Sequence, residues 1–161
     1  MAVTRPGLST LGVKFGYAVE TVAGTCPAAF TQLERCNNIA GIELSTEQID
    51  ASALEDLVTK YVAGRQDTGG TWTVTFNLTS EVVTQLETMI AAYNTGQAES
   101  TPKNTWFEVW SPNQSKGFFV VAQPPQKLPM PEFGQNALQT IDITLTIVDY
   151  KGQLTAVEPT A

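Results

Sequence analysis

The chain has 161 residues, 42% of them hydrophobic, and its sixteen acidic and nine basic side chains give a net charge of −7. This length suits a single domain, residues 1–161, with a core that needs no disulfide. The sequence contains no histidine, which excludes imidazole-based catalysis and removes the commonest metal ligand. The basic residues are scattered, so the sequence does not predict a cationic patch that grips nucleic acid.

No stretch of the chain approaches the roughly 18 to 20 apolar residues that cross a bilayer. Residues 1–11 lack the apolar core of a secretory signal. We therefore expect a protein that is made in a cytoplasm and has no membrane-spanning segment. The two cysteines, Cys26 and Cys36, lack the close spacing of a redox pair, and free thiols in or near a core are expected for both.

The first part of the chain alternates extended segments with turns. Residues 1–12 carry Pro, Gly, Ser and Thr and are expected to form an N-terminal arm that orders only on assembly. Residues 14–21 predict a short strand, and residues 30–45 predict a longer, irregular strand with a bulge at its Asn-Asn pair. Glu43 is expected on the polar face of this second strand.

The segment of residues 46–69 lies between two predicted strands and is far longer than a hairpin loop of roughly two to five residues. Two interpretations carry equal weight. In the first, a surface helix spans residues 52–61 and lays Leu54, Leu57 and Tyr61 on the body of the protein. In the second, the segment protrudes and contacts a partner.

The clearest pattern lies in residues 70–79, where four apolar side chains alternate with threonine and asparagine. Residues 140–147 repeat this pattern with three isoleucines and a leucine. A period of two, rich in β-branched and aromatic residues, predicts strands with one buried and one polar face. We expect both strands in one antiparallel sheet whose polar face is wetted.

A helix is predicted directly after the first of these strands. Ser80 is placed to cap its beginning, and residues 94–96, Asn-Thr-Gly, are expected to end it. The helix carries an apolar stripe that predicts packing against the core and needs no cofactor. This stripe consists of Val82, Leu86, Met89, Ile90 and Tyr93.

Three further segments complete the chain. Residues 105–110 and 116–122 predict a hairpin with both faces at least partly buried. Residues 123–134 contain four prolines and cannot form a central strand. Residues 151–161 are expected to form a second extended arm, which orders on assembly like the first.

Three runs of sequence carry a resemblance that covers residues 12–151: DASALED at 50–56, YVAGRQDTGG at 61–70 and FVVAQPPQK at 119–127. The order of elements adds to it, with two arms, a long loop between strands, one helix and a closing Thr-rich strand. In these features the chain resembles the major tail tube proteins of long-tailed, siphovirus-type bacteriophages. These motifs are typical of a group of related proteins, and they do not indicate catalytic or ligand-binding chemistry.

The resemblance implies a mainly β fold with one flanking α-helix, a tail-tube-type β-sandwich or barrel whose sheets join between subunits around a channel. It implies a structural virion protein that assembles as stacked hexameric rings into the tail tube that conducts DNA from the capsid during ejection. The implied partners are further copies of the chain, a tape-measure protein, a tail tip or baseplate initiator, and a tail terminator. Viral DNA passes transiently. The resemblance implies no enzyme activity and no cofactor, and it implies assembly in the host cytoplasm.

Two groups of candidate functional residues follow. The candidate lumen residues are expected on the polar, solvent-facing sides of the strands best suited to line a channel. They are Glu43, Thr73, Thr75, Asn77, Asp142 and Thr144. The resemblance implies that residues 46–69 contact the adjacent ring, and the candidate contact residues are Leu54, Asp56, Leu57, Tyr61 and Arg65. Because duplex DNA carries about one negative charge per 1.7 Å of axis, a Thr-lined neutral or acidic wall lets it slide.

Three other interpretations remain open at this point. The chain resembles a tube protein, but a tail terminator or head-tail joining protein would form one ring and stop. The inner-tube subunit of a contractile injection or type VI secretion machine would share the fold. A hydrolase would use paired carboxylates from Asp50, Glu55 and Asp56, although their flanks provide no pocket and solvated loop acids are commoner.

Overall fold

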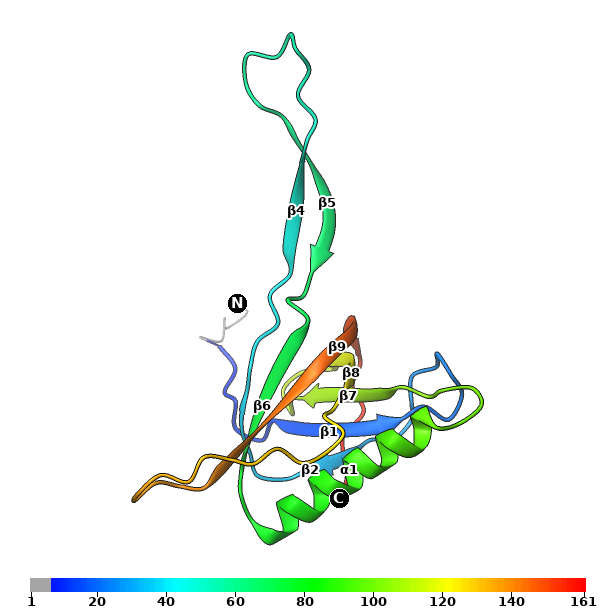
Figure 1. The fold of residues 1–161 in the computed structure, drawn as a ribbon, viewed down its shortest axis with the longest axis vertical. Helices are drawn as coiled ribbons and strands as arrows, with labels where there is room; N and C mark the ends of the chain where they lie inside the picture. Colours follow the sequence, from blue (N-terminus) through cyan, green and yellow to red (C-terminus); the bar gives the residue numbers. More distant parts are fainter. Residues whose placement is uncertain (1–6) are drawn as a thin grey trace, which may run out of the picture.

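The computed structural model describes residues 7–161, so residues 1–6 of the expected N-terminal arm lie outside the described residues. The described chain is mainly β with one helix (Figure 1). In chain order, its elements are β1 (Lys14–Val19), β2 (Thr31–Leu33), β3 (Cys36–Ile39), β4 (Ser45–Asp50), β5 (Tyr61–Asp67), β6 (Thr71–Asn77), α1 (Ser80–Gln97), β7 (Thr105–Trp110), β8 (Lys116–Gln123) and β9 (Thr140–Thr155).

Seven strands form one antiparallel sheet in the order β2-β1-β7-β8-β9-β6-β3, and β4 and β5 form a separate two-stranded sheet. The edge strands β2 and β3 are joined through Glu34 and Arg35, and Arg35 has a φ of 56°. The chain therefore pairs with β1, bends, and then pairs with β6, as strands do at the corner of a sandwich. Among the described residues the sheet stays open and does not close into a barrel.

The strand predicted for residues 30–45 is shorter in the structure than expected. The register of β3 against β6 shifts between Cys36 and Asn38, which confirms the predicted bulge. Residues 40–44, however, form no strand and lead out of the sheet toward β4. Glu43 lies in this connection, so its expected place on the polar face of a strand is wrong.

The main core lies where β6 and β9 cross over β1 and β7 (Figure 1). Phe15 of β1 is central to it, since its ring centroid lies 5.5 Å from that of Trp72 and 5.6 Å from that of Phe107. These contacts join side chains from β1, β6 and β7. The predicted alternation in β6 and β9 is confirmed, and the buried side chains are Trp72, Val74, Phe76, Ile141, Ile143 and Leu145.

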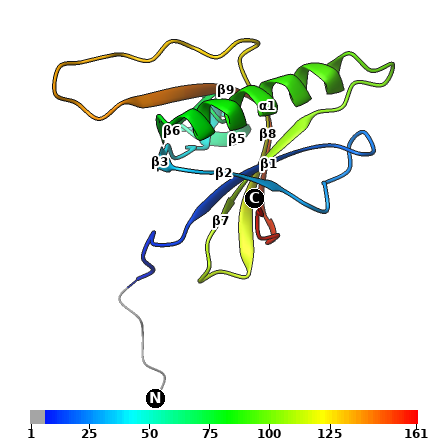
Figure 2. The same cartoon turned by 90° about the horizontal axis from the view of Figure 1, so that it is seen from below.

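Helix α1 lies against β1 and β2 at the lower end of the molecule (Figure 1) and runs across the view from below (Figure 2). Its cap is Thr79 and not Ser80, because the Thr79 side chain accepts a hydrogen bond from the Val82 N–H at 3.2 Å. Of the predicted apolar stripe Tyr93 is half-buried, and the fully buried members are Val82, Leu86, Met89 and Ile90.

The end of the helix also differs from the prediction. Residues 94–96 stay helical and α1 runs on to Gln97. Gly96 is buried within it, and a Cβ added there would lie 3.1 Å from both the Val19 Cγ1 and the Lys103 carbonyl oxygen. This glycine therefore permits a close approach between helix and strand and does not end the helix.

Residues 46–69 form a hairpin, so of the two interpretations of this segment the surface helix over residues 52–61 is wrong, and the segment protrudes. Strands β4 and β5 pair antiparallel and extend from the body along the long axis of the molecule (Figure 1). The Asp50 and Asp56 carboxylates accept hydrogen bonds from nearby backbone N–H groups, each at 2.8 Å. Such bonds favour turns over a helix. Strands β7 and β8 form the hairpin predicted from residues 105–110 and 116–122.

The C-terminal residues are docked on the body, which corrects the expectation of an arm that orders only on assembly. Residues 152–155 belong to β9 and pair with β8. Residues 156–160, called here the C-terminal strap, continue to the edge of β2. There the Gln32 N–H donates to the Thr160 carbonyl at 2.8 Å, and the Thr160 N–H donates to the Phe30 carbonyl at 3.1 Å.

Candidate assembly surfaces

The exposed face of the β6–β9 pair carries a row of polar side chains, called here the polar ladder. Cross-strand neighbours in it are hydrogen-bonded: the Thr73 and Thr144 hydroxyls lie 3.3 Å apart, and the Thr75 hydroxyl donates to the Asp142 carboxylate at 2.6 Å. This pairing follows from the strand register, which sets Thr73 opposite Thr144 and Thr75 opposite Asp142. The ladder consists of Thr73, Thr75, Asn77, Asp142 and Thr144.

Five of the six candidate lumen residues therefore share one face, and Glu43 does not. Asn77 lies at the end of the ladder, where its side-chain oxygen accepts a hydrogen bond from the Asn37 amide at 2.9 Å. Glu43 lies near the root of the β4–β5 hairpin, beside Ser45 and Asp67. The ladder offers hydroxyl, amide and carboxylate groups and no cation, so it has no side chain that would neutralise the charge of a phosphate.

The turn of the β4–β5 hairpin, residues 51–60, is called here the hairpin tip. Leu54 and Leu57 are fully exposed in it, with relative accessibilities of 109% and 102%, and Val58 is 75% exposed. Tyr61, just beyond the tip, is 60% exposed. The hairpin holds these side chains away from the body, so the interpretation in which a surface helix lays them on it is wrong. Several apolar side chains together on one protrusion are typical of an interaction site.

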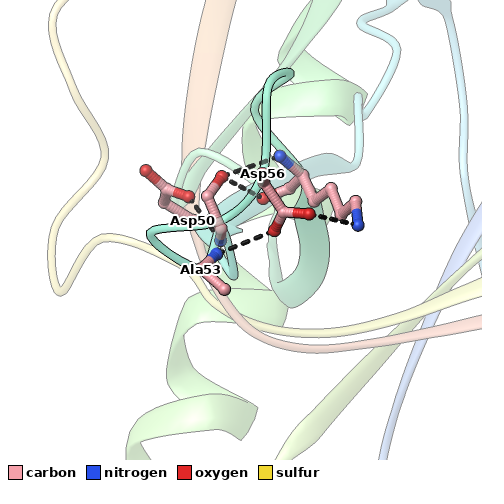
Figure 3. Close-up of polar contacts among 5 residues, drawn as sticks. Asp50, Ala53 and Asp56 are labelled. Atoms are coloured by element: carbon pink, nitrogen blue, oxygen red, sulfur yellow. Dashed lines mark hydrogen bonds and ion pairs between the residues drawn. The ribbon is translucent and has the colours of Figure 1, made fainter.

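Short polar contacts hold the hairpin tip in one conformation (Figure 3). The Ser52 N–H donates to Asp50 at 2.8 Å, and the Ser52 hydroxyl accepts from the Lys60 N–H at 2.8 Å. The Ala53 N–H donates to Asp56 at 2.8 Å. The apolar side chains are thus presented on a locally hydrogen-bonded turn, which reduces the entropy lost on docking.

Asp56 already has an ionic partner within the tip. Its carboxylate lies 2.5 Å from the Lys60 ammonium, four residues along the chain. This contact, followed by the Ala53 N–H, lowers the pKa of Asp56 below its ordinary value. Arg65 lies exposed in β5, outside the tip. The structure therefore brings Leu54, Asp56 and Leu57 together and leaves Arg65 apart from them.

A groove of about 640 Å³ opens beside β3, and it was not predicted from the sequence. It is called here the mouth groove. It lies between residues 36–42, residues 8–13, the turn after β7 and parts of β6, β7, β8 and β9. No charged side chain lines it among the described residues, and its apolar lining includes Ile39, Ile42, Trp72, Val109, Phe118 and Tyr150. Sequence periodicity could not reveal it, because the lining comes from segments distant in sequence.

Two buried carboxylates were also missed. Glu20 is 4% exposed and accepts hydrogen bonds from the Trp106 indole N–H at 2.8 Å and from the Gly24 and Asn104 N–H groups. It ties the loop after β1 to the start of β7. The signal for the second, Glu108, was present in the sequence, because it stands in a strand for which both faces were predicted to be partly buried.

Glu108 has no exposed surface and anchors the C-terminal strap. Its Oε1 accepts a hydrogen bond from the Val157 N–H at 2.9 Å, whereas its Oε2 has no partner among the described residues. Burial raises the pKa of Glu108 to about 7, although the Val157 N–H acts in the opposite direction. The ionised form is therefore disfavoured in the folded protein.

Other titratable groups offer little chemistry. Both cysteines are free thiols: Cys36 is half-buried against the core, whereas Cys26 is exposed. Within residues 7–161, no group of three His, Cys, Asp or Glu side chains is placed to hold a metal ion. Across the same residues, no helix is long and apolar enough to span a membrane.

Comparisons with known proteins give matches among solved structures. No family model matches the chain, and no curated protein matches it. Among solved structures, it is similar to a chain in the cryo-EM structure of the anti-feeding prophage (AFP) baseplate, 6-fold symmetrised. The sequence identity is 11% and the TM-score 0.42, over 96% of this chain and 97% of that chain. A similarity this weak supports no conclusion about what this chain does.

The raised pKa of Glu108 predicts a stability that depends on pH. The folded protein holds the Glu108 proton more tightly than the unfolded chain, whose carboxyl has its ordinary pKa of 4.5. The contribution of Glu108 to the free energy of unfolding is therefore greatest at low pH, and it falls as the pH rises through the interval from 4.5 to about 7. Between pH 5 and pH 8 the loss is roughly 2 kcal/mol.

The measurement compares the free energy of unfolding of the wild type and Glu108→Gln across this pH range. We expect the difference between the two proteins to change by roughly 2 kcal/mol in favour of Glu108→Gln as the pH rises. Glu158→Gln is the matched control, because Glu158 forms an exposed ion pair with Lys14 at 2.7 Å. Parallel curves for the wild type and Glu108→Gln would contradict the prediction.

Proposed function

We propose that this protein is a structural subunit of a bacteriophage tail and, more specifically, the major tail tube protein of a long-tailed, siphovirus-type phage. In this role it has no catalytic activity, is assembled in the host cytoplasm and resides in the virion tail. The observation that carries the proposal is the hairpin tip, whose Leu54 and Leu57 are fully exposed. Burying a leucine side chain stabilises a contact by about 1.5 to 3 kcal/mol, so the tip gains substantially from a partner surface.

A second copy of the chain is the partner that fits an extended filament. When the tip of one copy contacts a different surface of the next, the contact is heterologous and repeats without closing. Hexameric rings that stack through such contacts form a tube, as the resemblance to tail tube proteins implies. Growth then has to be limited from outside, by a tape-measure protein, an initiating tail tip or baseplate, and a terminator.

The polar ladder supports the assignment of a channel for DNA. Its Thr and Asp side chains pair with one another by hydrogen bonds, its Asn77 accepts a hydrogen bond from Asn37, and it includes no cation. The whole chain carries a net charge of −7. A wall of this kind does not release counterions from DNA and so does not bind it. The sheets of neighbouring subunits would join around the channel and leave no exposed edge there.

The first test of the proposal changes the hairpin tip. The double variant Leu54→Asp, Leu57→Asp is expected to fold, because both side chains are fully exposed, but to lose tube formation. Negative-stain electron microscopy across a concentration series, with and without nuclei from disrupted tails, measures this. Circular dichroism checks the fold. Leu54→Met, Leu57→Met keeps the apolar surface and is expected to form tubes.

The outcomes separate the alternatives. Tubes of the wild type that the Asp variant cannot form support the proposal. Isolated rings of the wild type, even with nuclei present, would indicate a tail terminator. Normal tubes of the Asp variant would contradict a contact role for the tip.

The second test changes the polar ladder. Thr75→Lys, Thr144→Lys adds about twelve positive charges to a hexameric ring, and these charges attract the DNA phosphates. We expect intact tails and DNA ejection that is slower by about tenfold or more, since each 1.4 kcal/mol of added attraction has that effect. Time-resolved ejection from virions measures it, with Thr75→Ser, Thr144→Ser as the control. Unchanged ejection kinetics would argue against a lumenal ladder.

A further inference from the structure

The hairpin tip and the mouth groove have matching surface chemistry. The tip presents Leu54, Leu57 and Val58 to solvent. The groove is mainly apolar, although Ser, Thr, Asn and Gln side chains also line it, and it has no charged side chain among the described residues that line it. An uncharged groove disfavours a charged occupant, because burying an unpaired charge is costly. The tip meets this requirement at Asp56, which is paired with Lys60. Glu55 is exposed beside Leu54 and has to stay at the solvent side of the contact.

The groove also lies next to the root of the hairpin. Gly41 and Ile42 line it, and the chain continues from them through residues 43 and 44 into β4. The tip is at the opposite end of the same hairpin, which extends from the body along the long axis of the molecule (Figure 1). A tip therefore lies far from its own groove and can reach only the groove of another copy.

The length of the hairpin fixes where that other copy lies. At about 3.3 Å per residue, β4 alone rises roughly 17 Å from Ser45 to Asp50, and the turn of residues 51–60 extends the hairpin further. A second copy displaced along the hairpin by its full length has its hairpin root, and with it the mouth groove, at the level of the first copy's tip. The same displacement repeated gives an unlimited stack.

We infer that the hairpin tip of one copy docks in the mouth groove of the copy stacked on it. This inference rests on the proposed tube function and identifies the surface that receives the tip. The apolar side chains of the tip contact the apolar lining of the groove, and the hairpin acts as the spacer that sets the axial repeat of the stack.

The test mixes two single-cysteine variants in a Cys26→Ser, Cys36→Ser background. One carries Leu57→Cys at the tip, and the other carries Gln114→Cys at the exposed rim of the groove. After co-assembly into tubes and oxidation, we expect disulfide-linked pairs of the two variants as the main covalent product. Such a bond joins two different copies, because each variant carries only one of the two introduced cysteines. Mass-tagging one variant distinguishes these pairs from pairs of like variants.

A matched control replaces Gln114→Cys by Thr84→Cys, which is exposed on α1 and does not line the groove. Few linked pairs are expected with it. Should Cys36→Ser impair folding, the pair is tested with Cys36 retained, because burial raises the pKa of its thiol to about 11 and makes it slow to oxidise. Cys36 lines the groove, so a bond between it and the tip cysteine would also place the tip there.

A failure of the docking inference can be distinguished from a failure of the proposed function. Intact tubes in which the tip cysteine links to Thr84→Cys as readily as to Gln114→Cys, or to neither, overturn the docking inference and leave the tube proposal standing. A wild-type chain that forms no tubes overturns the proposed function, and the inference falls with it.

Discussion

The pairing of β6 with β9 is the constraint on which the rest of the structure depends. Its register runs from Thr71 opposite Thr146 to Asn77 opposite Thr140 without a shift. Because side chains alternate, this one register places the apolar side chains of both strands in the core and every member of the polar ladder on the other face. A slip by one residue would exchange the two faces. The core, the packing of α1 and the proposed channel wall thus share one origin.

The same sheet positions the other surfaces. Chain segments on the core side bring Phe15 against Trp72 and close the fold with α1. Residues 40–44 and 68–70 connect the sheet to the hairpin, so the hairpin tip is carried on a framework that the core holds in place. The mouth groove lies beside the same connection. A protrusion and a groove on one chain provide the two unlike surfaces that a head-to-tail stack requires.

The sequence predicts the elements whose side chains alternate between core and solvent. Strands β6 and β9 and helix α1 follow from periodicity, which reports burial on one face. The β4–β5 hairpin does not, because nearly all its side chains are exposed and carry no such period. The docking of the C-terminal strap depends on single long-range contacts, such as the Val157 N–H with Glu108, which no local pattern encodes. The candidate lumen residues divide in the same way. Five of them lie on strands with alternating side chains and form the polar ladder, whereas Glu43 lies off the sheet.

The most direct test of the account is a cryo-EM reconstruction of the assembled protein, in which side chains on β6 and β9 are resolved. We predict a hollow tube with Thr73, Thr75, Asp142 and Thr144 on the channel wall. A tube whose channel is lined by another face, with the polar ladder on its outer surface or buried between subunits, would contradict the proposed channel wall.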